Sequence, residues 1–112
     1  MEPGALLPGT LDLLILKAVS LGPLHGYAVL LRLLQITAGA LMIEQGAVYP
    51  ALYRLEHHGL LSAEWGLSDN KRRARFYSLT SAGRKRLREE TASWHLLVSA
   101  IASALKTSPG DL

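Results

Sequence analysis

Apolar side chains recur at helical spacing in two blocks near the start of the chain. The first block, residues 11–21, follows Thr10, a residue type that favours helix N-caps, and it ends at Gly22-Pro23, which stops a helix. The second block, residues 25–37, carries a wide apolar face. We therefore expect two helices with a short turn between them. The apolar face of the second helix comprises Tyr27, Val29, Leu30, Leu33 and Leu34.

A third helical pattern covers residues 46–58, GAVYPALYRLEHH, where Val48, Leu52 and Leu55 recur four and three residues apart. Gly59 marks its end, because glycine adopts the left-handed conformation of a helix C′ position at little cost. The apolar residues 41–43, just before this helix, predict a short strand.

Pro50 stands inside this third pattern, although proline in a helix interior costs about 3 kcal/mol or more. We expect the helix to begin at Gly46 or Ala47. Pro50 then falls in the first turn, where a backbone N–H has no helical partner. The free N–H groups of that turn can point at a phosphate, and Gly46 lets the backbone approach it closely.

After residue 60 the helical spacing gives way to alternation, which is typical of strands. Residues 61–65 predict one strand and residues 75–79 a second, joined by a polar loop at 66–74 with a strongly basic end. Together they predict a hairpin. Leu61, Ala63 and Trp65 are expected on one face of the first strand, and Tyr77 and Leu79 are expected to point inward from the second.

A long last helix is expected from Thr80 or Ser81, either of which can cap it, to about Leu105. Its apolar side chains follow a heptad spacing, which is typical of helices that pair along a seam. The preceding domain cannot cover the whole stripe, so we expect a two-fold dimer. The seam consists of Leu87, Thr91, Trp94, Val98, Ile101 and Leu105, and Leu97 widens it. Paired Trp94 side chains of two subunits could leave a slot for a flat aromatic molecule.

Three helices, a basic hairpin and a long terminal helix follow the order of a winged helix-turn-helix domain with an appended helix. In this mainly α fold, the third helix is in the recognition position and the hairpin loop is the wing. We predict a DNA-binding domain at 1–80, a dimerisation helix at 81–106 and a disordered tail at 107–112. The fold fits DNA binding, but fold alone does not establish function.

The composition fits a small oligomeric protein better than a membrane protein. The chain has 112 residues, 49% of them hydrophobic, and its mean hydropathy of +0.19 is high for one small domain. No stretch approaches the roughly 18 uncharged apolar residues of a spanning helix, and the chain does not begin like a signal peptide. We expect a cytoplasmic oligomer that buries part of its apolar surface between subunits.

Positive charge is concentrated in one part of the chain. The net charge is only +3, but eight of the twelve lysines and arginines fall in residues 71–88, which contain no acidic residue. In the wing, four positive charges within five residues favour contact with a DNA backbone over a solvated loop tip. The basic start of the last helix is more ambiguous, because Lys85 can pair with Glu89 and Arg86 with Glu90 at i,i+4 spacing.

The candidate DNA contacts lie on the third helix and on the wing. Tyrosine hydroxyls can meet phosphates, and an arginine can meet a phosphate or the edge of a guanine. Tyr49 fits a half-buried core position equally well, with only its hydroxyl wet. The candidates on the helix are Gln45, Gly46, Ala47, Tyr49, Pro50, Tyr53 and Arg54, and those on the wing are Lys71, Arg72, Arg73 and Arg75.

No residue pattern indicates an enzyme, a metal site or a cofactor. The chain has no cysteine, so neither disulfides nor thiolate ligands are expected. Two of the four histidines, His57 and His58, are adjacent and point about 100° apart on a helix, so they do not form a shared metal face. No arrangement of serine, histidine and acid can be argued from spacing, and there is no glycine-rich phosphate loop. We therefore expect no catalytic residues, no metal and no cofactor.

Three ordered blocks of the sequence resemble the PadR family of bacterial transcriptional regulators. They are LPGTLDLLILKAVSLGPLHGYAVL, QGAVYPALYRLEHHGLL and RRARFYSLTSAGRKRL, and the resemblance covers about residues 6–106. Its most specific parts are His25-Gly26-Tyr27, the series of Gly46, Tyr49-Pro50, Leu52, Arg54-Leu55-Glu56 and Gly59-Leu60, and the series of Tyr77, Leu79-Thr80 and Gly83.

The resemblance implies a winged-helix dimer that represses transcription by binding a double-stranded operator of two-fold character. The single short C-terminal helix is similar to that of the family's compact branch, in which this helix dimerises. Members often release DNA when a small, frequently aromatic effector binds near the dimer interface. This sequence departs from the family at two positions. Ala47 replaces a common serine or threonine, which removes one possible contact, and Leu60 replaces a frequent tryptophan, which alters packing under the wing.

Two other interpretations stay open at this level. The chain could be a winged-helix module that binds an acidic protein through its basic wing, without sequence-specific DNA binding. It could also attach to anionic membranes through the basic terminal helix, although a dimer explains the apolar seam better. We expect double-stranded DNA, a second copy of the chain and a small aromatic effector as partners, and no membrane.

Overall fold

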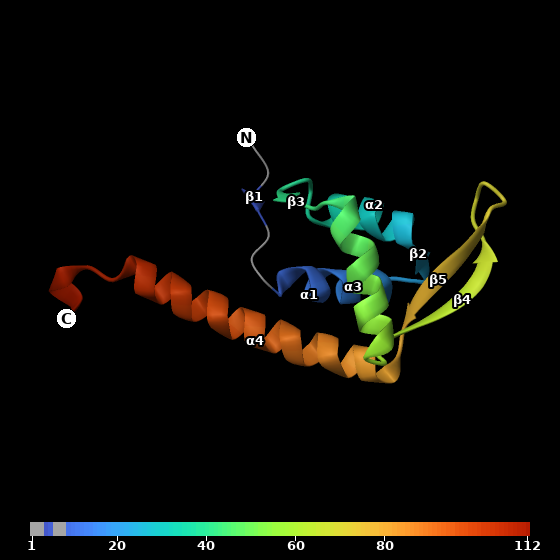
Figure 1. The fold of residues 1–112 in the computed structure, drawn as a ribbon. Coiled ribbons are helices and arrows are strands. Elements are labelled where there is room, and N and C mark those ends of the chain that lie inside the picture. Colours follow the sequence, from blue (N-terminus) through green and yellow to red (C-terminus); the bar gives the residue numbers. More distant parts are fainter. Residues whose placement is uncertain (1–3, 6–8) are drawn as a thin grey trace.

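Four helices and a small sheet make up the described part of the protein (Figure 1). The computed structural model describes residues 4–5 and 9–112. Its helices are α1 (Thr10–Ser20), α2 (Gly26–Ile36), α3 (Gln45–His57) and α4 (Ser81–Lys106), followed by the 3-10 helix η1 (Pro109–Asp111). Its strands are β1 (Gly4–Ala5), β2 (Leu24–His25), β3 (Leu41–Met42), β4 (Leu61–Leu67) and β5 (Arg73–Leu79). The predicted mainly α, winged helix-turn-helix architecture is confirmed.

The hairpin of β4 and β5 forms the wing. The two strands are antiparallel along their whole length, and β2 pairs antiparallel with the other edge of β5. The strands run further than the alternation predicted, so the loop shrinks from residues 66–74 to residues 68–72. A hydrogen bond from the Ser68 N–H to the Arg72 carbonyl, 2.9 Å long, closes this loop. The short strands β1 and β3 form a separate parallel pair.

The core lies between α1, α2, α3 and the base of the hairpin. Each helix turns its apolar face toward this core, which is why helical spacing in the sequence marked these segments. The buried side chains of the helices include Ile15, Leu33 and Leu52, and those of the strands are Leu61, Tyr77 and Leu79. For Tyr77 and Leu79, the prediction of an inward face is confirmed.

Trp65 lies on the same face of the hairpin as Leu61 and Ala63, as predicted, but further from the base. Its side chain is 60% exposed. Alternation indicates the face on which a strand side chain lies, but it carries no information on how far the helices cover that face. Trp65 therefore lies beyond the part of this face that the helices bury.

Two helix starts also differ from the predictions. α1 begins at Thr10 with Gly9 as its N-cap, in the left-handed conformation at φ 84°, and no side chain caps it. Thr10 is therefore the first helical residue instead of the cap. α3 begins at Gln45, with the extended residue Glu44 as its N-cap. Pro50 consequently lies in the second turn and not in the first.

Thr80 fixes the point where the hairpin ends and α4 begins. Its hydroxyl oxygen accepts the Gly83 N–H at 2.9 Å, as predicted for a cap, and donates to the Gly59 carbonyl at 2.7 Å. A side chain at position 83 would collide with the Leu60 carbonyl oxygen, so only glycine permits this close approach. The start of α4 is thereby locked to the C-terminal end of α3.

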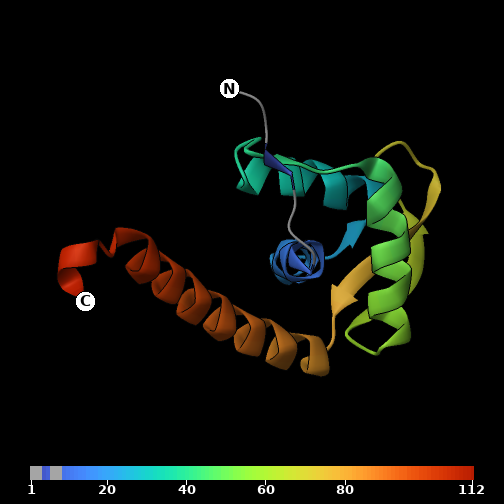
Figure 2. The ribbon, with the colours of Figure 1, turned by 60° about the vertical axis from the view of Figure 1, so that its left-hand side comes forward.

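Most of α4 projects away from the rest of the domain (Figures 1 and 2). It packs against α1 near its beginning, and Gly83 is its only buried residue. The described chain is 63 Å long in its longest direction because of this projection. Residues 107–112 differ from the predicted disordered tail, since they contain η1, in which Asp111 accepts hydrogen bonds from the N–H and hydroxyl of Ser108.

Candidate nucleic-acid interface

One side of α3 faces solvent and carries the predicted helix contacts. The first residues of the helix, at positions 45–47, are all exposed. Tyr49 is 47% exposed and Tyr53 is 68% exposed, and Pro50 lies between them on the same surface. The opposite side of α3 is buried in the core through Val48 and Leu52. The helix therefore divides cleanly into a packing face and an open face of aromatic and polar residues.

Pro50 does not break α3, although it lies inside the helix. A proline has no N–H, so the carbonyl of Gly46, four residues earlier, lacks its usual helical donor. At the start of the same helix, the Ala47 N–H donates to the carbonyl of Glu44 at 3.0 Å. Pro50 itself is exposed, so its ring is accommodated on the open face of the helix.

Tyr49 packs closely against the start of α2. A Cβ atom at Gly26 would collide with the Tyr49 ring, so the glycine of the HGY series makes room for this tyrosine. His25 precedes it as the N-cap of α2, and its Nδ1 accepts the Ala28 N–H at 3.2 Å. The two interpretations of Tyr49 are therefore compatible, since one edge of its ring packs on α2 while nearly half of the side chain stays exposed.

Arg54 forms an ion pair across the domain with Asp12 of α1. The distance between Nη2 and Oδ1 is 2.5 Å, and the two side chains are 48% and 35% exposed. Sequence spacing did not predict this pair, because the partners are 42 positions apart. The guanidinium that was predicted to meet DNA is thus held at the edge of the α1–α3 interface in the absence of DNA.

The wing carries the remaining predicted contacts. Lys71, Arg72 and Arg73 are exposed, and Lys71 adopts a positive φ of 58° in the turn. Arg75 differs from them, because its Nη2 lies 2.6 Å from Oε2 of Glu56 on α3. This ion pair connects the wing to the recognition helix. Arg75 is therefore less available to a partner than the three basic residues nearer the tip.

Trp65 is a residue of this surface that the sequence interpretation missed. The guanidinium carbon of Arg73 lies 4.7 Å from the centre of the Trp65 ring, and that of Arg75 lies 6.0 Å away. Both arginines face Trp65 from the neighbouring strand, where Trp65 is directly opposite Arg75. An exposed tryptophan flanked by two arginines is a cation–π arrangement. In the sequence, the feature that pointed to Trp65 was its position in a strand that leads directly into a basic loop.

Tyr77 lies at the bottom of the same region, at the base of the wing. Burial raises the pKa of its phenol, the nearby Arg75 guanidinium opposes this rise, and Glu56 and Tyr49 add to it. The phenol is therefore neutral at physiological pH and acts as a hydrogen-bonding group without charge. The positive potential of the wing comes from its arginines and lysine.

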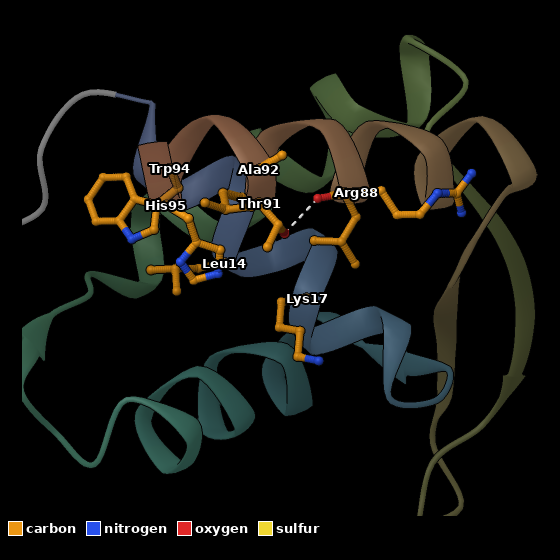
Figure 3. A pocket seen from close by; sticks show the side chains of 9 residues that line it. Leu14, Lys17, Arg88, Thr91, Ala92, Trp94 and His95 are labelled. Atoms are coloured by element: carbon orange, nitrogen blue, oxygen red, sulfur yellow. Dashed lines mark hydrogen bonds between the residues drawn. The ribbon is translucent and has the colours of Figure 1, made fainter. Parts of the chain in front are cut away.

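A hollow lies between α1 and α4, with a volume of about 600 Å³. Figure 3 shows Leu14 of α1 beside Trp94 and His95 of α4, whereas the side chain of Lys17 extends away from α4. Arg88 of α4 also lines it, so two cationic groups border a largely apolar wall. Trp94 thus lines a hollow within one subunit. The slot predicted between paired Trp94 side chains of two subunits stays a prediction.

The predicted dimer seam forms a continuous stripe along α4. Leu87, its first member, packs against the core, and the members that follow it are exposed. Leu97, Val98 and Ile101 are 50%, 44% and 48% exposed, and Leu105 is 82% exposed. Thr91 donates its hydroxyl hydrogen to the Leu87 carbonyl at 2.6 Å and so presents its methyl group to the stripe. A large apolar surface is therefore unpartnered within one subunit.

Neither a metal cluster nor a membrane span is found in the part of the chain that the structure describes. No three metal-ligating side chains gather within residues 4–5 and 9–112. Within the same residues, no helix combines the length and the apolar character that crossing a bilayer requires.

Comparisons with known proteins agree on one family. The family model described as "Transcriptional regulator PadR-like family" matches residues 15–89. A PadR family transcriptional regulator from Eggerthella lenta is 34% identical, with 89% of this chain and 85% of that chain covered at a TM-score of 0.75. A transcriptional regulator from Clostridium thermocellum is 26% identical, with 88% and 95% covered at a TM-score of 0.78. No curated protein sequence matches the chain significantly.

Proposed function

Since the chain belongs to the PadR-like family of transcriptional regulators, we propose that it is a dimeric repressor that binds a two-fold operator. In each subunit α3 enters the major groove of double-stranded DNA, and the wing follows the adjacent backbone. The observation that carries this proposal is the continuity of the surface. Tyr49 of α3 and Trp65 and Arg75 of the wing line one open cavity, so helix and wing present a single face to a partner.

Individual contacts on this face have distinct roles in the proposal. The hydroxyls of Tyr49 and Tyr53 and the N–H groups at the start of α3 meet phosphates. Arg54 leaves Asp12 to reach a base edge or a phosphate. The exposed basic residues of the wing neutralise phosphates without reading sequence. As a regulator of transcription, the protein would act in the cytoplasm, where bacterial DNA lies.

The second subunit is proposed to cover the apolar stripe of α4. Two copies of the exposed part of the stripe, from Thr91 to Leu105, would meet across a two-fold axis, and both would be removed from water. The two recognition helices are then related by the same symmetry, which is what an operator of inverted repeats requires. Sedimentation of the purified protein tests this directly, since a monomer at all concentrations would contradict it.

The groove between α1 and α4 supports an effector site. Its wall is mostly apolar and includes Trp94, while Lys17 and Arg88 can attract a negative group. A small aromatic molecule that carries a carboxylate therefore fits its chemistry. Binding there would act on the contact between α1 and α4, and so on the spacing of the two DNA-binding domains. Release of DNA by such a molecule tests this part of the proposal.

Selection of binding sites from random duplex DNA tests the function as a whole. The purified protein is expected to enrich an inverted repeat with half-sites near one helical turn apart. If no sequence is enriched at low or moderate salt, the protein does not bind a defined operator by itself. The alternative of a protein-interaction module predicts binding to duplex DNA that is either absent or independent of sequence, and retention of an acidic protein partner through the wing.

A further inference from the structure

The cavity between the recognition helix and the wing has an unusual concentration of aromatic rings. It has a volume of about 310 Å³, and Tyr49, Trp65 and Tyr77 line it from three different elements. These are three of only seven tryptophan, tyrosine and phenylalanine residues in the chain. His25 and Arg75 complete its walls. Nearly half of the aromatic residues of this small protein therefore line one open cavity. Packing of the core does not require so many rings at this place.

The rings at the mouth of this cavity are only partly used for packing, since Tyr49 packs on α2 along one edge and Trp65 is mostly exposed. Trp65 is 60% exposed and Tyr49 is 47% exposed, whereas Tyr77 at the bottom is buried. Leaving the face of a tryptophan in water forfeits the free energy that its burial would contribute. The indole instead supports the guanidinium of Arg73 at 4.7 Å. Arg73 forms no ion pair with any described residue, so its charge is free to meet an anion.

We propose that this cavity is a subsite for one segment of the DNA backbone. A deoxyribose packs against the Trp65 indole, and Arg73, held over the same ring, donates to an adjacent phosphate. Tyr49 donates its hydroxyl hydrogen to a phosphate from the opposite wall. Trp65 is thus both a contact and a positioning residue for Arg73. The inference rests on the proposed function, since it specifies how the wing and α3 share one strand of the bound duplex.

The alternative occupant is a small planar molecule, and two observations disfavour it. The cavity is open on one side, and its volume lies at the lower end of the range of ligand pockets, which usually enclose most of their ligand. The cations are also placed at its rim and not in its interior, because Arg73 is on the outer part of the hairpin and Arg75 is paired with Glu56. An extended anionic strand that passes over the mouth satisfies this arrangement better.

Fluorescence of Trp65 gives a direct test in the full-length chain. The chain contains only two tryptophans, so Trp94→Phe leaves Trp65 as the sole emitter and keeps a ring in the α4 seam. Titration with a short mixed-sequence duplex at low salt is expected to change the Trp65 emission saturably, and added salt should reverse the change. Trp65→Ala should weaken duplex binding by about three- to tenfold, and Trp65→Phe by less.

A double-mutant cycle separates positioning from simple contact. Arg73→Ala should weaken binding clearly in the parent protein, but much less in the Trp65→Ala background, because the arginine has then already lost its support. Leu67→Ala is the matched control, since Leu67 is 71% exposed on the same strand and does not line the cavity. Thermal unfolding of the Trp65 variants should stay close to that of the parent, as expected for an exposed side chain.

Several results would overturn the inference. They are an unchanged affinity of Trp65→Ala, additive losses in the cycle, or an equal loss in Leu67→Ala. Quenching of Trp65 by naphthoate together with competition against the duplex would assign the cavity to a small molecule. If the parent binds no duplex at all, the proposed function fails. If the parent binds duplex DNA and the Trp65 variants bind it with the same affinity, only the subsite fails.

Discussion

Replacing Asp12 by asparagine removes the acidic partner of Arg54 and nearly preserves the shape of the side chain. The contact is short, at 2.5 Å, but the two side chains are 35% and 48% exposed. A pair exposed to this extent contributes roughly 0.2–1 kcal/mol, because water screens both charges and two side chains lose conformational freedom. We therefore expect Asp12→Asn to lower the free energy of unfolding by no more than about 1 kcal/mol.

The expected effect on DNA binding has the opposite sign. If Arg54 meets DNA, its guanidinium must first leave Asp12, and the loss of that pair is subtracted from the binding free energy. Asp12→Asn should then tighten binding by up to about fivefold, which is the equivalent of about 1 kcal/mol. Arg54→Ala should weaken binding to the selected operator more than to unrelated duplexes, by roughly 1–3 kcal/mol if the guanidinium reaches a base edge.

Fluorescence anisotropy with labelled duplexes measures the affinities of the parent, of Asp12→Asn, of Arg54→Ala and of the double variant. Asp12→Asn should lose its effect in the Arg54→Ala background, since no guanidinium remains to be released. Glu90→Gln is the matched control, because it also removes one negative charge, but from the exposed surface of α4. A comparable gain in the control would show that net charge alone causes the change.

The result that refutes this reasoning is a loss of affinity in Asp12→Asn as large as that in Arg54→Ala. The ion pair would then hold α3 in place against α1, and Arg54 would have no role on DNA of its own. An equal loss for operator and unrelated duplexes in Arg54→Ala would instead make the arginine a phosphate contact.

Three further predictions concern the wing, the seam and the core. Arg72→Ala together with Arg73→Ala should weaken binding to every duplex and reduce the salt slope by about two, and an unchanged slope would remove the wing from the interface. Val98→Glu should split the dimer and abolish operator binding; if sedimentation still finds a dimer, the seam lies elsewhere on α4. Burial raises the Tyr77 pKa, so its stabilising contribution is present below the unfolded pKa of about 10 and is lost as the pH rises through the folded value. Tyr77→Phe should therefore lose less stability than the parent between neutral and alkaline pH, as measured by denaturant midpoints.

The helices and the hairpin could be predicted because their signals are local. Helical spacing and alternation depend on which residues face the core, and the core lies on the expected faces of α3 and β5. On α2 the predicted face was too wide: Val29, Leu30 and Leu33 are buried, but Tyr27 and Leu34 are 49% and 39% exposed. Helix starts were less predictable. The position of Pro50 suggested a start at Gly46 or Ala47, but the helix accommodates the proline in its second turn, on the exposed side, where the ring meets no packed neighbour.

The contacts between distant residues could not be read from spacing. Lys85 and Glu89, which are four positions apart on α4, form the predicted ion pair at 3.8 Å. The pairs that tie α3 to its surroundings, through Arg54 and Arg75, join residues 42 and 19 positions apart. Such pairs depend on how the helices and the hairpin are placed in space, and no period in the sequence encodes that placement.

Trp65, a residue of the candidate site, shows the same limit of sequence patterns. Alternation predicted the face of the hairpin on which Trp65 lies but not its exposure, because β4 and β5 extend past the helices that cover their base. What makes it part of the interface is its partner Arg73, which alternation alone leaves as one more charge in a basic loop. The pairing register of the hairpin was needed to bring the two side chains together.

The position of α1 explains how events on α4 can reach the recognition helix. Leu14 and Lys17 line the groove toward α4, while Asp12, on the first turn of the same helix, holds Arg54 of α3. α1 is a short helix with a buried, well-packed face, so it moves as a unit when it moves at all. A molecule or partner helix seated in the groove therefore acts on the helix that restrains Arg54. The strength of that restraint is what the Asp12→Asn cycle measures, and it sets an upper limit of about 1 kcal/mol on the regulation that this one contact can transmit.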